Sequence, residues 1–120
     1  MDRNRFRRIV RRALDELPPE IATLLDNVDL VIEREPSAED LRESGEEAAN
    51  GLFGLYLGIP QTERESYGMT LPDRIAIYQG PLERAFHPRD IPREVRITVA
   101  HEIGHHFGID EQRLHELGLG

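Results

Sequence analysis

Four of the chain's five histidines lie in one segment, "VRITVAHEIGHHFGIDEQRLHEL", at positions 95–117. His101 and His105 are four residues apart, so on a helix their imidazoles project from one face and can share an ion. Neutral imidazole is a favoured ligand of zinc in open catalytic sites. Glu102 follows the first histidine, where its carboxylate can act as general base on a water at the ion, as in HExxH helices. The segment therefore predicts a hydrolytic zinc site.

A third ligand is expected just after this helix. Gly108 lies three residues past His105, where a left-handed residue commonly ends a helix and redirects the chain. Such a turn can bring Asp110 or Glu111 back to the same ion, giving two imidazoles, one carboxylate and one open position. The chain has no cysteine, which excludes thiolate ligands. The spacing alone does not choose between the two acids.

The remaining histidines are expected to lie outside this ligand set. His106 is about 100° around the helix from its neighbour, so we expect it to face away from the ion. His115 is an alternative third ligand or a supporting partner, although its surroundings are more typical of a solvated helix face. His87 precedes a proline and is expected in a loop.

A long helix from about Ile91 to Phe107 must carry the motif, with proline tolerated in its first turn. Alternating apolar residues in "VDLVIERE" predict a half-buried strand, and "GLFGLYLG" and "RIAIYQ" predict two more. A basic amphipathic helix opens the chain. By contrast, the acidic stretch at about 35–50 has few large apolar residues and predicts a flexible surface loop. The pattern as a whole predicts an α+β fold.

Length and composition restrict the class of protein. A chain of 120 residues without repeats is expected to form one domain over residues 1–120, because a second core would bury too little surface. The net charge of -8 disfavours a nucleic-acid partner. No window approaches the roughly 20 apolar residues that span a bilayer, and no secretory signal is evident. We therefore expect a cytoplasmic protein that does not bind membranes, and its oligomeric state stays open.

The segments "HEIGHHFGIDEQRLHELG", "LPDRIAIYQGPLERAF" and "ALDELPPEIATLLDNVDLVIE" resemble the small bacterial zincin-like metallopeptidase family, the minimal zincins, whose motif is HExxHxxGxxD. The resemblance extends over nearly the whole chain. It implies a compact α+β domain in which a small mixed sheet lies over the active-site helix. It further implies His101 and His105 as zinc ligands and Glu102 as catalytic base. The family's aspartate ligand falls on Glu111, a longer carboxylate, with Asp110 beside it as the alternative.

The resemblance also implies how the site is supported. Both methionines precede the motif, so we expect no methionine turn beneath the metal. The resemblance suggests a tyrosine in its place and leaves three candidates open, Tyr56, Tyr67 and Tyr78.

Two functions follow from these residues. The first is a zinc-dependent peptidase in which Glu102 activates water against a peptide or protein substrate, with "RIAIYQ" pairing with the extended substrate as an added strand. The second is a zinc-stabilised binding or regulatory module without proteolysis, which the short chain and the glutamate at position 111 both motivate.

Overall fold

Helices cover both faces of a small sheet. The computed structural model describes residues 1–46, 51–58 and 72–120. Its elements are α1 (Arg3–Asp15), α2 (Pro19–Ala22), η1 (Thr23–Leu25), β1 (Val28–Glu33), α3 (Ala38–Ser44), β2 (Gly54–Leu57), β3 (Asp73–Tyr78), α5 (Gln79–Ala85), η3 (Pro88–Asp90), α6 (Ile91–Phe107) and α7 (Glu111–Glu116). Within these described stretches, no helix combines the length and the apolar character needed to cross a bilayer.

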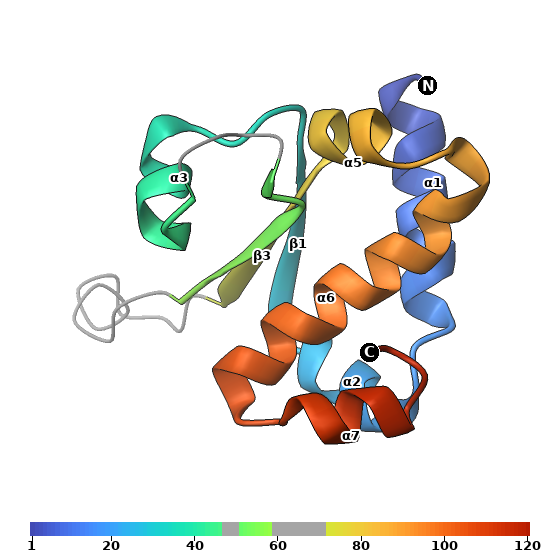
Figure 1. Ribbon diagram of the computed structural model, residues 1–120, viewed down its shortest axis with the longest axis vertical. Coiled ribbons are helices and arrows are strands. Elements are labelled where there is room, and N and C mark those ends of the chain that lie inside the picture. The colour runs from blue at the N-terminus through green and yellow to red at the C-terminus, as the bar shows by residue number, and fades with distance from the viewer. Residues whose placement is uncertain (47–50, 59–71) are drawn as a thin grey trace.

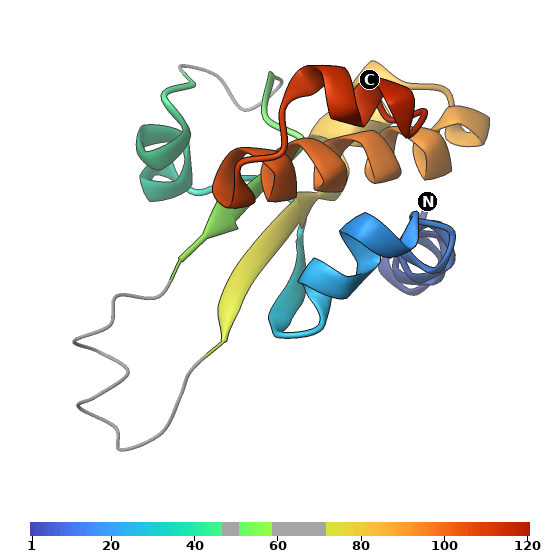
Figure 2. The same cartoon turned by 90° about the horizontal axis from the view of Figure 1, so that it is seen from below.

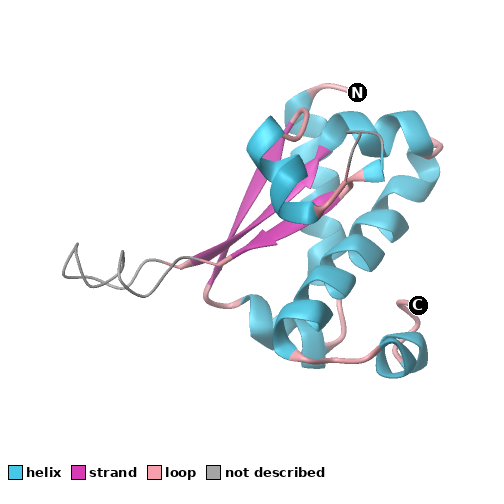
Figure 3. Ribbon diagram, turned by 60° about the vertical axis from the view of Figure 1, so that its left-hand side comes forward, coloured by secondary structure: helices cyan, strands magenta, loops and turns pink. Residues whose placement is uncertain are grey.

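The three strands form one mixed sheet in the order β1-β3-β2 (Figure 3). β3 runs parallel to β1, with Val28 opposite Asp73, and antiparallel to β2, with Tyr56 opposite Ile75. The predicted α+β fold with a small mixed sheet is therefore confirmed. The strand order also corrects one expectation. Because β3 has a partner on each side, the "RIAIYQ" segment cannot take a substrate as an added strand.

β3 is buried on both faces because alternate residues of a strand point to opposite sides. Ile75 and Ile77 belong to the main core, which α1 and α6 complete. Ala76 and Tyr78 belong to a smaller cluster on the other face, against which Leu41 of α3 packs. The sheet thus has a thick helical layer on one side and a thin one on the other.

Helix α6 is the centre of the main core, and its predicted bounds are confirmed. Its buried residues recur at helical spacing: Ile91, Val95, Val99, Ala100, Ile103 and Gly104. α1 packs beside it through Phe6 and Val10, which are four residues apart on one face. Figures 1 and 2 show α6 along one side of the sheet, with α1 next to it and α3 on the opposite side.

Helix α3 lies within the acidic segment that the sequence assigns to a loop. Ser37 is its N-cap, and the side-chain oxygen accepts a hydrogen bond from the backbone N–H of Asp40 at 3.0 Å. Glu39 and Asp40 occupy the first turn, where negative charge is favoured by the helix dipole. Capping therefore outweighs the acidic composition here. Residues 47–50 lie outside the described residues.

Candidate metal centre

The residues of the HExxH motif occupy the last two turns of α6. The helix ends at Gly108, whose φ of 79° is left-handed and is readily adopted only without a Cβ atom. Its backbone N–H donates to the carbonyl of Gly104, which satisfies one of the last helical acceptors. α7 begins three residues later, so the chain turns back beside the end of α6 (Figure 1).

The two acids after the turn have different surroundings. Asp110 is the N-cap of α7, and its Oδ1 accepts a hydrogen bond from the backbone N–H of Arg113 at 2.8 Å. Glu111 is the first residue of the helix, and its carboxylate faces the histidines instead. The Arg113 guanidinium also binds Glu20 of α2, and this hydrogen bond holds the pKa of the Glu20 carboxyl below its ordinary value. α7 is thereby attached to α2.

One carboxylate oxygen lies near both histidines of the motif. Glu111 Oε1 is 3.1 Å from His101 Nδ1 and 3.9 Å from His105 Nε2. The side chains of His105 and Glu111 are 72% and 65% exposed, whereas His101 is 28% exposed. Glu111 therefore lies near both histidines at the surface, and His101 is the most buried of the three side chains.

The kinds of donor fit zinc, which binds imidazole nitrogen and carboxylate oxygen. With bonds of about 2.0–2.2 Å, neighbouring donors in a tetrahedral site are about 3.3–3.6 Å apart, so the two distances lie on either side of the expected value. The imidazole rings are 6.5 Å apart at an angle of 85°. Across the described part of the chain, no three His, Asp or Glu side chains converge as a complete ligand set.

The second ring nitrogen of His101 contacts the backbone of Leu119. Its Nε2 is 3.1 Å from the carbonyl oxygen of Leu119. Leu119 is itself anchored, because its side chain is only 4% exposed in the main core and its N–H donates to the carbonyl of Leu114. This contact directs Nδ1 of the ring toward Glu111.

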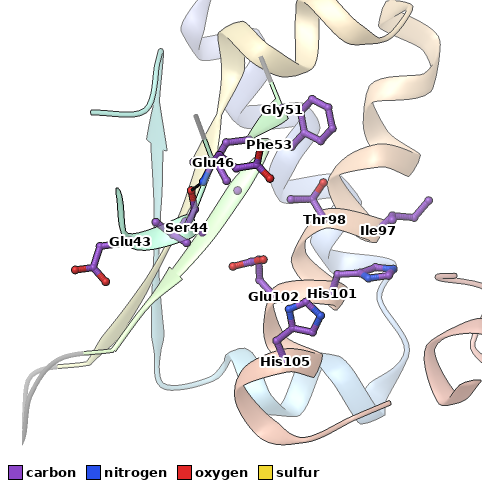
Figure 4. A pocket seen from close by; sticks show the side chains of 13 residues that line it. Glu43, Ser44, Glu46, Gly51, Phe53, Ile97, Thr98, His101, Glu102 and His105 are labelled. Carbon is purple, nitrogen blue, oxygen red and sulfur yellow. Dashed lines mark hydrogen bonds between the residues drawn. The ribbon is translucent and has the colours of Figure 1, made fainter. Parts of the chain in front are cut away.

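Glu102 points toward the sheet and binds its outer strand. Its Oε1 accepts a hydrogen bond from the backbone N–H of Tyr56 in β2 at 2.8 Å. Figure 4 shows the Glu102 carboxylate directed from α6 toward β2, with the His101 ring directed away from it. A cavity of about 520 Å³ opens here, lined by the motif residues, by Phe53, Gly54 and by the helices α3 and α6.

Gly54 sets the distance between β2 and α6. A Cβ atom at this position would lie 2.7 Å from Thr98 Cγ2 and 3.0 Å from the carbonyl oxygen of Ala76. Glycine therefore lets the strand approach the helix closely enough for the Tyr56 N–H to reach Glu102.

The other candidates lie elsewhere. His115 and His87 are exposed, and His106 stacks on Tyr56. Tyr78 is buried on the far face of the sheet and donates to Asp40 Oδ2 at 2.8 Å, so it does not support the motif. Tyr67 lies outside the described residues.

The sequence did not predict two groups that contact the motif, the backbone N–H of Tyr56 and the backbone carbonyl of Leu119. Both belong to the main chain, so no residue type marks them. The sequence offered one indirect signal for the Tyr56 N–H. Tyr56 lies in an apolar run predicted to be a strand, and a strand at the edge of a sheet has backbone N–H groups that can bind a carboxylate.

Comparisons with known proteins find similarity in both sequence and fold. Residues 25–120 match the sequence profile of a family described as zincin-like metallopeptidase. Among solved structures, a conserved hypothetical protein from T. thermophilus is similar, with 25% sequence identity and a TM-score of 0.55 over 89% of this chain and 94% of that chain. No curated protein matches the sequence.

Proposed function

Because the chain belongs to the zincin-like metallopeptidase family, we propose that it is a zinc-dependent peptidase. The observation that carries this proposal is that Glu111 Oε1 lies 3.1 Å from His101 and 3.9 Å from His105, next to a cavity that His101, Glu102 and His105 line. His101 and His105 would hold the ion together with Glu111. Zinc, when bound, would supply Lewis-acid activation of water and of the scissile carbonyl.

Glu102 is the proposed general base. Its Oε1 is engaged by the Tyr56 N–H, which fixes the direction of the carboxylate. The second oxygen can take the proton of the attacking water and return it to the leaving amine. A fixed orientation favours this transfer because the reacting atoms need not be ordered at the moment of reaction.

The proposed substrate class is supported by the outer edge of the sheet. Among the described strands, β2 pairs with β3 alone, and its other edge faces α6 and the cavity. An extended peptide can add to such an edge through main-chain hydrogen bonds. The edge of β2 therefore replaces β3 as the proposed site of strand addition. We propose a peptide or protein segment as substrate and a cytoplasmic location for the reaction.

Glu111 is the proposed third ligand rather than Asp110. The Glu111 carboxylate is the group that lies beside both imidazoles, whereas Asp110 uses an oxygen to cap α7. Capping contributes about 1 kcal/mol to a helix, so moving Asp110 to the ion would lose that contribution.

The test measures zinc content and peptide cleavage together. We expect about one zinc per chain in the parent protein and in Asp110→Ala, and loss of zinc in Glu111→Ala. Glu102→Gln should retain zinc and lose cleavage of a peptide library by roughly 100-fold or more, because an amide cannot take the proton. Undiminished cleavage by Glu102→Gln would rule out the proposed base.

A second function is favoured by one observation. The proposed ligands come from α6 and α7, so a bound ion would join two helices and could serve the fold alone. In that case zinc would raise stability in Glu102→Gln and in the parent protein equally, and neither would cleave peptides at any zinc concentration.

A further inference from the structure

Tyr56 contacts two carboxylates with two different groups. Its backbone N–H donates to Glu102 at 2.8 Å, and its phenol O–H donates to Asp73 Oδ2 at 2.6 Å. Asp73 is the first residue of β3, the strand that pairs with β2. The side chain of Tyr56 therefore links β2 to β3, and its backbone N–H links β2 to α6.

His106 holds the same tyrosine from the helix. The imidazole of His106 stacks on the Tyr56 ring with centroids 4.0 Å apart and an interplanar angle of 22°. Its Nε2 lies 3.7 Å from Asp73 Oδ2. The Phe107 ring packs edge-on against both rings, with its centroid 4.8 Å from that of His106 and 6.1 Å from that of Tyr56.

Helical spacing explains why one residue of β2 meets two residues of α6. Glu102 and His106 are four positions apart, so both project from the same face of α6. Glu102 contacts the Tyr56 amide, and His106 contacts its ring one turn later. Both contacts therefore join the same residue of β2 to α6.

We propose that His106, Tyr56 and Asp73 form a clamp that positions the Glu102 carboxylate. His106 is a positioning residue in this clamp and not a metal ligand. A glutamate side chain has several rotatable bonds, and β2 is a strand of four residues whose described sheet partner is β3. Stacking by His106 limits the movement of β2 and so keeps the Tyr56 amide within reach of the carboxylate.

The catalytic meaning of the clamp rests on the proposed peptidase function, but the clamp itself is tested without activity. Hydrogen exchange of the Tyr56 amide is measured by NMR in the full chain. We expect His106→Ala to accelerate this exchange roughly tenfold, the order of effect that loss of a stacked aromatic pair produces, and His106→Phe to restore it. Tyr56→Phe, which removes the bond to Asp73 and keeps the ring, should accelerate it as well.

The controls separate the clamp from general destabilisation and from metal binding. His87→Ala removes another exposed histidine and should leave Tyr56 exchange unchanged. His106→Ala should keep the zinc content of the parent protein. Loss of zinc in this variant, or unchanged Tyr56 exchange in His106→Ala and Tyr56→Phe, would overturn the proposal. If peptides are cleaved, kcat should fall in His106→Ala with little change in KM and recover in His106→Phe. Absence of cleavage in the parent protein would reject the peptidase and leave the exchange result to decide the clamp.

Discussion

At the scale of single residues, Asp110 and Glu111 show how one methylene group separates two tasks. The shorter Asp110 reaches a backbone N–H of its own helix, and the longer Glu111 reaches across the turn to His101. Glutamate at position 111 therefore combines a negative charge with enough reach to contact an imidazole of the preceding helix.

Tyr78 provides a prediction about pH. Burial, the hydrogen bond to Asp40 and the charge of that carboxylate raise the pKa of the Tyr78 phenol well above its ordinary value. The folded state thus keeps this proton at pH values where the unfolded state has lost it. Its contribution to stability is fully present below pH of about 10 and is lost as pH rises toward the folded pKa.

We expect the free energy of unfolding to fall above pH of about 10, with a slope from Tyr78 of up to about 1.4 kcal/mol per pH unit. Tyr78→Phe should remove this slope, although it lowers stability at neutral pH by about 1 kcal/mol through the lost hydrogen bond. Urea unfolding at a series of pH values measures both quantities. Equal slopes in the two proteins would contradict the assignment to Tyr78.

At the scale of elements, the packing of β2 on α6 depends on glycine at position 54, which has no side chain. Gly54→Ala places a methyl group against the Thr98 methyl, at a distance that real contacts do not reach. We expect a loss of about 1–3 kcal/mol from such overpacking. The strand should also shift away from α6 and weaken the bond between Tyr56 and Glu102.

Thr98→Ser offers a matched test because it removes the methyl group that the new Cβ meets. The double variant Gly54→Ala with Thr98→Ser should be more stable than the sum of the single changes predicts, and recovery should be partial because the Ala76 carbonyl stays close. Urea unfolding of the four proteins gives the coupling energy. Strict additivity would show that the two residues do not contact each other.

The sequence predicted local features well and relations between elements poorly. The bounds of α6 follow from apolar spacing and the glycine after Phe107, and β3 follows from its apolar residues. The central place of β3 could not be predicted, because strand order depends on contacts between distant segments. α3 was missed because its few apolar residues concealed a capped helix. The proposed ligands could be named from the sequence alone because all of them lie within eleven consecutive residues, His101 to Glu111.

At the scale of the whole molecule, zinc is expected to act as a link between α6 and α7. Any ligand that binds only the folded state stabilises it, by about 2.7 kcal/mol at 100 times its dissociation constant. We expect zinc to raise Tm by several degrees after the protein has been treated with chelator. His105→Ala should lose this response, and His115→Ala should keep it. A zinc response that survives in His105→Ala would place the ion elsewhere.

The separation in sequence between Glu102 and its hydrogen-bond partner is far larger than the separation among the proposed ligands. His101 and Glu111 are ten positions apart, whereas Glu102 and Tyr56 are separated by 46 residues. Closing a long loop costs more entropy and slows folding, so contacts within a short segment form first. The segment that holds the proposed ligands can therefore assemble early, while Glu102, the proposed base, acquires its partner only when β2 packs against α6. If the proposed site binds zinc, the ability to capture the ion should precede during folding the ability to use it.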